Sequence, residues 1–490
     1  MPIEYEKKLQ VSETPIPGLK VIDLSVHGDA RGWFKESWQR EKMVALGIPD
    51  KRWVQNNISF NERRGATRGI HAEPWDKLIS VATGSVFGAW VDLRAGSAAY
   101  GKVFTCVLDP SRAIYVPRGV GNSYQALEDG TAYTYLVDAH WSLEQKKTYT
   151  FVNLADPELA IEWPIPLSEC EISEADKHHP LLRDVVPMQP KRTLVTGCDG
   201  QLGRAVRKLA EERGVSETSD FTDIGDFDFS DPDQYSRVDW PLYGTVINCG
   251  AYTAVDRAET QEGRVAAWRA NATGPALLSK VCAEHGITLV HISSDYVFDG
   301  TREVHDEDEP LSPLSVYGAS KAAGDLAVST CPAHYILRSS WVIGDGNNFV
   351  RTMARLSDRC ADPDDPLDHV DVVDDQIGRL AFTDDMARAI FHLLEAEAPY
   401  GVYNLTCSGD PASWAGIARE VFELRNGNSV AVRPVKTSEY YENARPPVSR
   451  RPSFSTLALD KLANANFFPS RWRNGLENYI SKPWDKGGRR

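Results

Sequence analysis

The spacing of apolar residues changes near residue 185, and this change constrains the fold more than any other feature. Before it, short runs of strand-forming residues such as KVIDLSV, KLISVATGSVFGAWVDLR and TAYTYLV are separated by turn clusters such as RAGSAAYG. Closely spaced short strands are typical of an all-β sandwich or barrel. After it, the strand patterns TVINCGAYT and ITLVHISS flank a long helical pattern, which predicts βαβ units on a parallel sheet.

These patterns predict two domains in a chain of 490 residues, which is too long for one ordinary core. We expect a cupin-like jelly roll over residues 1–185. Residues 190–490 should form an α/β Rossmann-type domain, with a doubly wound parallel sheet and a small C-terminal substrate subdomain. The junction KHHPLLRDVVPMQPKR is rich in proline and mixed in charge, which predicts an inter-domain linker.

Charge and composition argue against several classes of partner. The formal net charge of -15 disfavours binding to nucleic acid or to an anionic membrane surface. The start, MPIEYEKKLQ, does not read as a signal peptide, and no apolar run is long enough to span a membrane. The 8 cysteines form no CxxC pair. We therefore expect a cytoplasmic protein with reduced thiols.

The stretch VTGCDGQLG carries three glycines at a spacing of three: Gly197, Gly200 and Gly203. They follow a predicted strand and open a predicted helix. Glycines here let a dinucleotide pyrophosphate approach the free N–H groups of the helix N-terminus. The alternative is a tight strand–helix turn with no ligand.

A second motif, VYGASK, places Tyr317 and Lys321 one helical turn apart. A nearby ammonium would lower the pKa of the Tyr317 phenol and let it pass a proton near neutral pH. Ser294 ends the upstream strand, where its hydroxyl could polarise a carbonyl. Strand ends at this edge of a parallel sheet are where ligands bind.

Five motifs in order, ISSDYVFDG, INCGAYTAVDRAE, SVYGASKAAGD, LRSSWVIGDGNNFV and VVDDQIG, resemble the dTDP-4-dehydrorhamnose reductases, a short-chain dehydrogenase/reductase family. The resemblance covers residues 192–482. It implies that Tyr317 donates the proton at C4 of the sugar and that Lys321 binds the nicotinamide ribose. It also implies that Asp295 and Trp341 line the sugar site. The implied cofactor-binding residues are Gly197, Gly200, Gln201, Leu202, Gly203, Asp228, Phe229, Gly250, Ala251, Tyr252, Tyr317 and Lys321.

The expected cofactor is NADPH or NADH. Asp220 would reach a ribose 2′-hydroxyl and disfavour a 2′-phosphate, whereas Arg204 would favour the phosphate, so both remain open. Some members of this family dimerise through a magnesium ion held partly by a glutamate after the glycine turn. Arg204 and Ala205 stand there, and we expect no metal-bridged dimer.

The first half contains RGIHAEPWDKLIS, with Arg68, His71 and Lys77 on adjoining strand positions. A lone histidine in a β-domain is more often a core residue or a metal ligand. Cupin-type metal sites need two or three histidines and a glutamate. With no HxH and no second well-placed histidine, we expect no metal.

The motifs DARGWFKESW, QNNISF, TRGIH, YVPRGVGNSYQAL and ISEADK resemble the dTDP-4-dehydrorhamnose 3,5-epimerases over residues 10–185. The resemblance implies that His71 is the base, paired with Asp176, which removes protons beside the C4 ketone. Lys77 would stabilise the enolate oxygen, and Tyr135 would return a proton on the opposite face. The implied substrate-binding residues are Arg31, Glu36, Gln55, Asn57, Arg68 and, as a stacking partner of thymine, Trp141.

Two departures concern the surroundings of the base. Asn122 stands where the family has a histidine, and Gly88 where it has an aspartate. We expect one rearranged polar contact to account for both. Whether both carbons or only one is epimerised stays open.

The two resemblances describe consecutive steps. We expect epimerisation of dTDP-4-dehydro-6-deoxy-D-glucose at C3 and C5, and then reduction of dTDP-4-dehydro-L-rhamnose to dTDP-L-rhamnose with NAD(P)H. Alternatives are a reductase with a non-catalytic nucleotide-sugar-binding module, and a 3-epimerase/reductase for another dTDP-deoxysugar. A third is a Rossmann protein with an unrelated β-domain. The expected partners are dTDP-4-keto-6-deoxyhexoses, and the expected assembly is a homodimer through the jelly roll.

Overall fold

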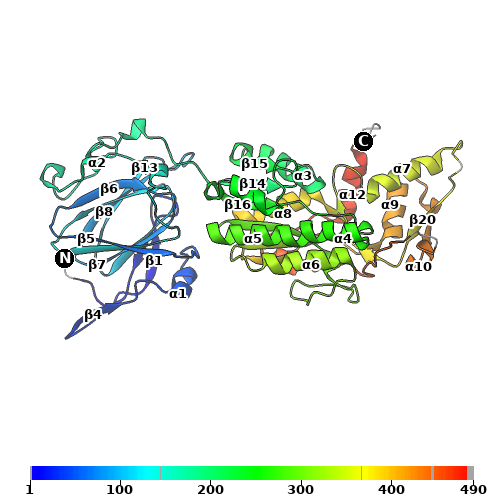
Figure 1. Cartoon of the computed structure of the whole chain (residues 1–490), viewed down its shortest axis with the longest axis horizontal. Coiled ribbons are helices and arrows are strands. Elements are labelled where there is room, and N and C mark those ends of the chain that lie inside the picture. The colour runs from blue at the N-terminus through cyan, green and yellow to red at the C-terminus, as the bar shows by residue number, and fades with distance from the viewer. Residues whose placement is uncertain (1–2, 144, 366, 443–445, 483–490) are drawn as a thin grey trace. The chain divides into compact units, whose positions relative to one another are not determined.

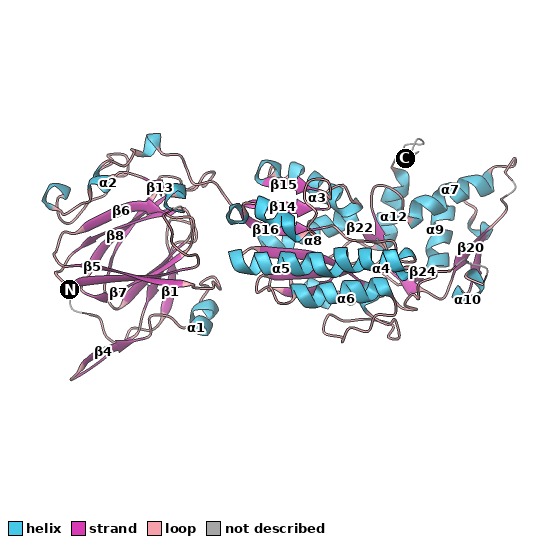
Figure 2. Cartoon of the chain, viewed as in Figure 1, coloured by secondary structure: helices cyan, strands magenta, loops and turns pink. Residues whose placement is uncertain are grey.

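The computed structural model describes residues 3–143, 145–365, 367–442 and 446–482. The chain divides into two compact units, Met1–Pro190 and Lys191–Arg490, which we describe separately. Figures 1 and 2 show a first unit of strands and a second unit in which helices surround a sheet. Among the described residues, no helix is both long and apolar enough to cross a membrane.

The first unit is a sandwich of two antiparallel sheets, which confirms the predicted all-β jelly roll. One sheet has the order β1 (Gln10–Glu13), β2 (Lys20–Asp23), β10 (Arg112–Val116), β7 (Lys77–Thr83), β12 (Thr131–Val137) and β5 (Gln55–Asn61). The other has the order β13 (Thr150–Phe151), β6 (Thr67–Ala72), β11 (Val120–Ala126), β8 (Val86–Asp92) and β9 (Val103–Leu108). A hairpin of β3 (Val26–Asp29) and β4 (Gly32–Lys35) and the short helices α1 (Arg40–Ala45) and α2 (Glu174–Lys177) complete it.

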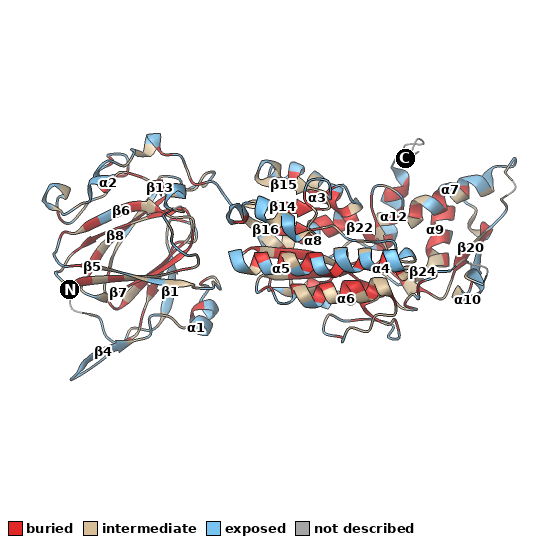
Figure 3. Ribbon diagram, in the orientation of Figure 1, coloured by how far each residue is buried: buried red, intermediate tan, exposed pale blue. Residues whose placement is uncertain are grey.

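The core of the first unit lies between the two sheets, where the burial colouring of Figure 3 is red. Ile79, Trp90, Tyr124 and Tyr133 come from β7, β8, β11 and β12 and pack together there. Tyr124 and Tyr133 stack with ring centres 4.1 Å apart. Because side chains alternate along a strand, residues two positions from these also point inward.

Most of the segment predicted as a linker, residues 177–192, belongs to the first unit. Val185 and Met188 are buried in a cluster of the first unit, and the Met188 backbone N–H donates to the Leu93 carbonyl at 2.8 Å. The Gln189 carbonyl accepts a hydrogen bond from Arg118 at 2.8 Å. The prolines and charges of this segment suggested a free connection, but its apolar side chains anchor it to the sandwich.

The second unit is built on a parallel six-stranded sheet with the order β15 (Ser219–Thr222), β14 (Arg192–Thr196), β16 (Tyr243–Asn248), β17 (Thr288–Ser294), β18 (His334–Ser339) and β23 (Gly401–Asn404). Its main helices are α3 (Gln201–Glu212), α4 (Gln261–Trp268), α5 (Gly274–His285), α6 (Val316–Val328) and α8 (Thr383–Glu395). The strand that follows β14 in the chain lies on one side of it and β16 on the other. This reversal, which confirms the doubly wound prediction, creates a ligand crevice at the carboxyl ends of β14 and β16.

A smaller subdomain follows, as predicted. It contains α7 (Phe349–Ala361), α9 (Trp414–Asn426), α10 (Thr437–Tyr440), α12 (Trp472–Ser481), β20 (Val370–Val373) and β25 (Val432–Val435). Short pieces β19 (Val342–Ile343), β21 (Ile377–Gly378), β22 (Ala381–Phe382), β24 (Ala412–Ser413) and α11 (Asp460–Asn464) complete the unit. Val350, Ile417, Val421 and Trp472 share a core cluster distinct from the one beneath the main sheet.

Candidate active sites

His71 lies on β6 and faces the interior of the first sandwich. It pairs with Asn122 on β11, while Arg68 pairs with Tyr124, so both side chains lie on the same face as the buried Tyr124. His71 Nε2 is 2.8 Å from Asp176 Oδ1. The structure therefore brings together the two residues expected to form the base.

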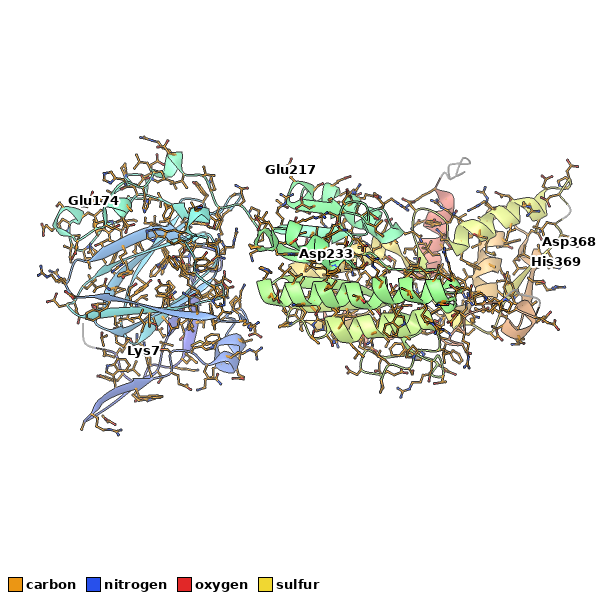
Figure 4. All side chains as sticks on the ribbon, in the orientation of Figure 1. Lys7, Glu174, Glu217, Asp233, Asp368 and His369 are labelled. Atoms are coloured by element: carbon orange, nitrogen blue, oxygen red, sulfur yellow. The ribbon has the colours of Figure 1, made fainter. Side chains whose placement is uncertain are left out.

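Asp176 is held by a short helix, α2, whose first residue, Glu174, is labelled in Figure 4. The Ser173 hydroxyl caps this helix by accepting from the Asp176 backbone N–H at 3.1 Å. The backbone N–H of Gly69 donates to Asp176 Oδ2 at 3.3 Å. Burial alone would raise the pKa of Asp176, but hydrogen bonds from His179 and His71 hold it well below its usual range.

A second histidine lies on the same carboxylate, which corrects the expectation that no other histidine is well placed. His179 Nε2 is 3.2 Å from Asp176 Oδ1, and its ring stacks on Phe151 with centres 4.5 Å apart. Polar atoms of His71, Asp176 and His179 lie within 4.8 Å of one another. Separations of 2.8 and 3.2 Å are those of hydrogen bonds, so Asp176 is a shared acceptor for two imidazoles.

Lys77 and Tyr135 come from the opposite sheet. Lys77 begins β7 two residues before the buried Ile79, and Tyr135 follows the buried Tyr133 by two residues on β12, so both point inward. Lys77 Nζ lies 5.5 Å from the centre of the Tyr135 ring. Burial and the negative charge of Glu73 raise the pKa of Tyr135 to about 12, which keeps its phenol protonated and able to act as an acid.

Three of the expected substrate-binding residues form a connected group on and beside β5. Gln55 Nε2 donates to Asn57 Oδ1 at 2.8 Å, and Gln55 Oε1 accepts from the Trp141 backbone N–H at 3.1 Å. The Trp141 side chain is 49% exposed and open to a stacking partner. Asn57 pairs with Tyr135 across β5 and β12, which places this group beside the expected acid.

Arg31 and Glu36 are not brought to this group within one chain. Arg31 lies in the turn between β3 and β4 with a side chain that is 90% exposed, and it pairs with Asp29. Glu36 pairs with Lys42 on α1. Both therefore lie on or beside an exposed hairpin and contact neighbouring residues of the same segment.

Asn122 and Gly88 each fit a different neighbouring side chain. The structure does not show the single rearranged polar contact that we expected to account for both. The Asn122 Oδ1 atom accepts a hydrogen bond from the Tyr133 hydroxyl at 2.9 Å. A Cβ atom at Gly88 would lie 2.1 Å from the Trp90 ring. The tyrosine thus engages the asparagine, and the indole fills the space beside the glycine.

In the second unit, Ser294 ends β17, and Tyr317 and Lys321 lie on α6. Ser294 hydrogen-bonds Tyr317, which lowers the pKa of that phenol, but burial dominates and raises it to about 12. The predicted lowering by Lys321 is therefore wrong. Lys321 Nζ donates instead to the Ile292 carbonyl at 2.6 Å, and burial lowers its pKa to about 8 against the opposing charge of Asp325.

Two of the three glycines in the turn are required by packing, whereas the third leaves room for a ligand. Gly197 has φ +68°, and its Cβ would lie 2.5 Å from the backbone of Gly250. A Cβ at Gly203 would lie 2.2 Å from the Gly197 carbonyl oxygen. Gly200 caps α3, and a Cβ there would meet only that same oxygen, at 3.2 Å. The open space before the helix N-terminus fits a bulky anion such as a dinucleotide pyrophosphate.

The other expected cofactor residues surround this crevice. Leu202 is buried in the core, so its side chain serves packing and only its backbone can face a ligand. Gln201 Oε1 accepts from the Gly344 backbone N–H at 2.9 Å. The Tyr252 backbone exchanges hydrogen bonds with Asn271, and its buried hydroxyl has no hydrogen-bond partner among the described residues. Ala251 lies between Tyr252 and Gly250, just past the end of β16.

Asp228 and Phe229 border the same region. Asp228 accepts hydrogen bonds from Ser230 and pairs with Arg269 at 3.0 Å. The Phe229 ring lies where side chains at Gly250 and Gly274 would otherwise be, with would-be Cβ distances of 2.5 and 2.6 Å. This contact fixes the aromatic ring beside the carboxyl end of β16.

The expected sugar-binding residues lie at the carboxyl ends of β17 and β18. Burial raises the pKa of Asp295 to about 6, against hydrogen bonds from Ser455 and Ser294. Trp341 has φ +46° and stacks on Trp414 with ring centres 3.8 Å apart. Asp295 directly follows β17, and Trp341 lies two residues after β18, so both are at the carboxyl edge of the sheet, where ligands bind.

Comparison with known proteins agrees with this division. The protein-family model described as RmlD substrate binding domain matches residues 191–483. A second family model, described as dTDP-4-dehydrorhamnose 3,5-epimerase, matches residues 13–184. The chain belongs to both families. We therefore call the two units the epimerase half and the reductase half.

Individual relatives cover each half almost completely. The epimerase half is 51% identical over 193 residues to an RmlC homologue from Streptococcus pyogenes, an alignment that covers 38% of this chain and 96% of that protein. The reductase half is 34% identical over 303 residues to a dTDP-4-dehydrorhamnose reductase from Aggregatibacter actinomycetemcomitans, covering 59% and 97%. A solved reductase from Bacillus anthracis in complex with NADP has a TM-score of 0.52, with 32% identity, and covers 59% of this chain and 98% of that one.

In the reductase half, Asp223 and not Asp220 contacts the glycine turn. Asp220 pairs with Arg192 at 2.6 Å and accepts a hydrogen bond from the Tyr243 hydroxyl at 2.9 Å. Arg192 and Tyr243 are the first residues of β14 and β16, so Asp220 lies towards the amino ends of the strands, away from the glycine turn. Asp223 follows β15 and accepts from the Asp199 backbone N–H of the glycine turn at 3.0 Å. The sequence signal for Asp223 was its position as the first acidic residue after the second strand of this half, β15. Arg204 donates to the backbone carbonyls of Asp199 and Asp345.

In the epimerase half, sequence reasoning missed Glu73 and His179. Glu73 forms an ion pair of 2.7 Å with Lys77. His179 lies three residues after Asp176, one helical turn away, in the segment assigned to the linker. The spacing of four residues in HAEPWDK and three in ADKHH was visible, but only folding shows that these side chains meet.

Proposed function

We propose that the chain catalyses two consecutive steps of dTDP-L-rhamnose synthesis. The epimerase half converts dTDP-4-dehydro-6-deoxy-D-glucose into dTDP-4-dehydro-L-rhamnose, and the reductase half reduces the C4 ketone with NAD(P)H. The observation that carries this proposal is one chain with two proton-handling sites. His71 and Asp176 face Lys77 and Tyr135 across one sandwich, and Ser294, Tyr317 and Lys321 form the second site.

In the epimerase half, His71 takes a proton from the carbon beside the ketone, and Asp176 stabilises the resulting imidazolium. The electron pair moves onto the C4 oxygen, where the Lys77 ammonium stabilises the enolate. Tyr135 then returns a proton from the other side, which inverts the carbon. Its raised pKa means that the phenol still carries this proton at neutral pH.

In the reductase half, Tyr317 donates a proton to the C4 ketone oxygen, with the Ser294 hydroxyl hydrogen-bonded beside it. The reduced nicotinamide, when bound, supplies the hydride. Lys321 would bind the nicotinamide ribose, and the space at Gly200 would accept the pyrophosphate. Asp223, which contacts the glycine turn, would face the ribose of the adenosine.

We also propose a homodimer through the epimerase half. Phe34 on the β3–β4 hairpin is 66% exposed, and Ile58 and Phe60 on the edge strand β5 are 68% and 58% exposed. Exposed apolar side chains of this size favour an interface. In such a dimer, Arg31 and Glu36 would serve the site of the partner copy. Phe34→Ser should shift the protein towards monomer in analytical ultracentrifugation.

A second candidate function is epimerisation at C3 alone. Asn122 pairs with His71 where the family has a histidine, and it is occupied by the Tyr133 hydroxyl. The position of the family's histidine is therefore held by an amide, which does not carry a proton to or from the substrate.

One experiment tests both functions. The protein is incubated with dTDP-4-dehydro-6-deoxy-D-glucose and NADPH in D₂O, and the product is identified by NMR. We expect dTDP-L-rhamnose with deuterium at C3 and C5. Deuterium at C3 alone would indicate the second function. Reduction with no exchange at either carbon would make the first half a binding module.

A further inference from the structure

A buried carboxylate that the mechanism above does not use lies beside Lys77. Glu73 Oε1 is 2.7 Å from Lys77 Nζ, and the two side chains are only 11% and 5% exposed. Removing two charges from water costs free energy that their mutual attraction often fails to recover. A pair of this kind is therefore weak evidence for stability, and its position calls for another explanation.

Glu73 lies in the connection that leads from β6 in one sheet to β7 in the other. This connection is held at several points. The Glu73 carbonyl accepts from the Gly119 backbone N–H at 3.2 Å, and Trp75 packs edge-on against Tyr149 with ring centres 5.4 Å apart. Asp76 accepts from the Tyr115 hydroxyl at 2.6 Å. The Glu73 carboxylate thus has a rigid support.

The ionisable groups around Glu73 come from several elements. Lys77 is on β7, Tyr133 and Tyr135 are on β12, and Tyr149 precedes β13. Burial raises the pKa of each of these three tyrosines, and the charge of Glu73 raises it further. The charge of Arg68 acts on Tyr135 in the opposite sense. One carboxylate therefore influences the expected acid and pairs with the expected enolate stabiliser.

We propose that Glu73 is a positioning residue of the epimerase half, which holds the Lys77 ammonium in one orientation beside Tyr135 and at the enolate oxygen. This inference rests on the function proposed above. Glu73 takes no proton from the sugar and gives none to it. Its charge balances the ammonium in the resting site, and the same charge favours the neutral phenol that returns the proton. Without it, Lys77 would remain a buried, unpaired cation, free to turn towards other acceptors.

The test compares Glu73→Gln, Lys77→Met and the double variant, by solvent-deuterium exchange into the 4-ketosugar. For Glu73→Gln we expect kcat to fall about tenfold or more, with KM changed less than about twofold, because Glu73 acts on the enolate and not on the bound ground state. In the Lys77→Met background the same change should cost less than about twofold, since residues that act as a unit are not additive. Glu73→Asp, which keeps the charge, should recover part of the rate.

Glu13→Gln is the matched control, because Glu13 lies on the edge strand β1, is 68% exposed and forms an ion pair of 2.9 Å with Lys20 on β2. It should leave exchange unchanged. Full kcat in folded Glu73→Gln, or equal losses from this change with and without Lys77, would overturn the proposal. If Glu73→Gln does not fold, Glu73→Asp is compared in the wild-type and Lys77→Met backgrounds, and its loss of rate should be confined to the wild-type background. Wild-type protein without exchange would contradict the proposed function itself.

Discussion

Each half of the molecule buries a lysine near the tyrosine that we propose as its proton donor, but the two lysines are held differently. Lys77 has a carboxylate in direct contact, Glu73 at 2.7 Å. Lys321 donates to the backbone carbonyl of Ile292 at 2.6 Å, and Asp325 acts on it only through its field. Asp325 itself pairs with Arg338 at 3.0 Å. A directly paired lysine suits a permanent positive charge at an enolate, whereas a lysine on a carbonyl is set to gain or lose its proton near neutral pH.

If the two halves are chemically separate, a change in one should spare the other, and the largest effect should come from His71→Ala. Loss of a base costs ~10²–10⁴ in rate, so exchange of the C3 and C5 protons with D₂O should disappear. The reductase half of this variant should still reduce substrate epimerised by a separate enzyme. Loss of that reduction too would show that the two sites are not separate.

Tyr317→Phe removes the proton donor of the other half and keeps the ring. We expect reduction to fall by ~10², with unchanged binding of NADPH by fluorescence titration and unchanged deuterium exchange. The control is the exchange reaction in the same sample. Near-full turnover by this variant would remove Tyr317 from the mechanism.

Gly200→Val should weaken binding of NADPH by about tenfold to a hundredfold, because a branched side chain would occupy the space before α3. The backbone of Gly200 has an ordinary φ of -69°, and its Cβ meets no side chain, so the fold should be kept. Circular dichroism and deuterium exchange report folding of each half. Unchanged affinity would exclude the glycine turn from cofactor binding.

The smallest effect concerns pH and tests the difference between the lysines directly. Burial lowers the pKa of Lys321 to about 8, so its positive charge is present below that pH and lost as pH rises through it. The rate of reduction should therefore fall above pH 8 by up to tenfold per unit, while exchange by the epimerase half shows no break there. Lys321→Arg should move the break to higher pH, since a guanidinium keeps its charge. A profile without a break would mean that the pKa of Lys321 is no longer near 8 once the cofactor is bound.

Periodicity predicted both folds because it is a local property of the sequence. Most of the candidate site residues came from the family motifs. Tyr317 and Lys321 meet because they are four residues apart on one helix, and the sequence shows that directly. The pKa of Tyr317 was wrongly predicted because burial dominates it, and burial is a property of the packed unit. Asp220 was named and Asp223 was missed, because a sequence pattern places the end of a strand only within a few residues.

Contacts between distant segments were the other limit. His179 meets Asp176 and packs on Phe151 only because a proline-rich segment returns to the sandwich. The hairpin with Arg31 shows the converse, since the family motif is present but the side chain points to solvent in one chain.

The glycine turn has a consequence for comparing genomes. A descendant of this chain that no longer bound a dinucleotide would still need glycine at positions 197 and 203, where backbone leaves no room for a side chain. Of these three glycines, Gly200 would be released, because among the described residues an added Cβ there would have only one carbonyl oxygen within 4 Å. In related sequences, the middle glycine is therefore the position that would distinguish an active reductase from an inherited scaffold.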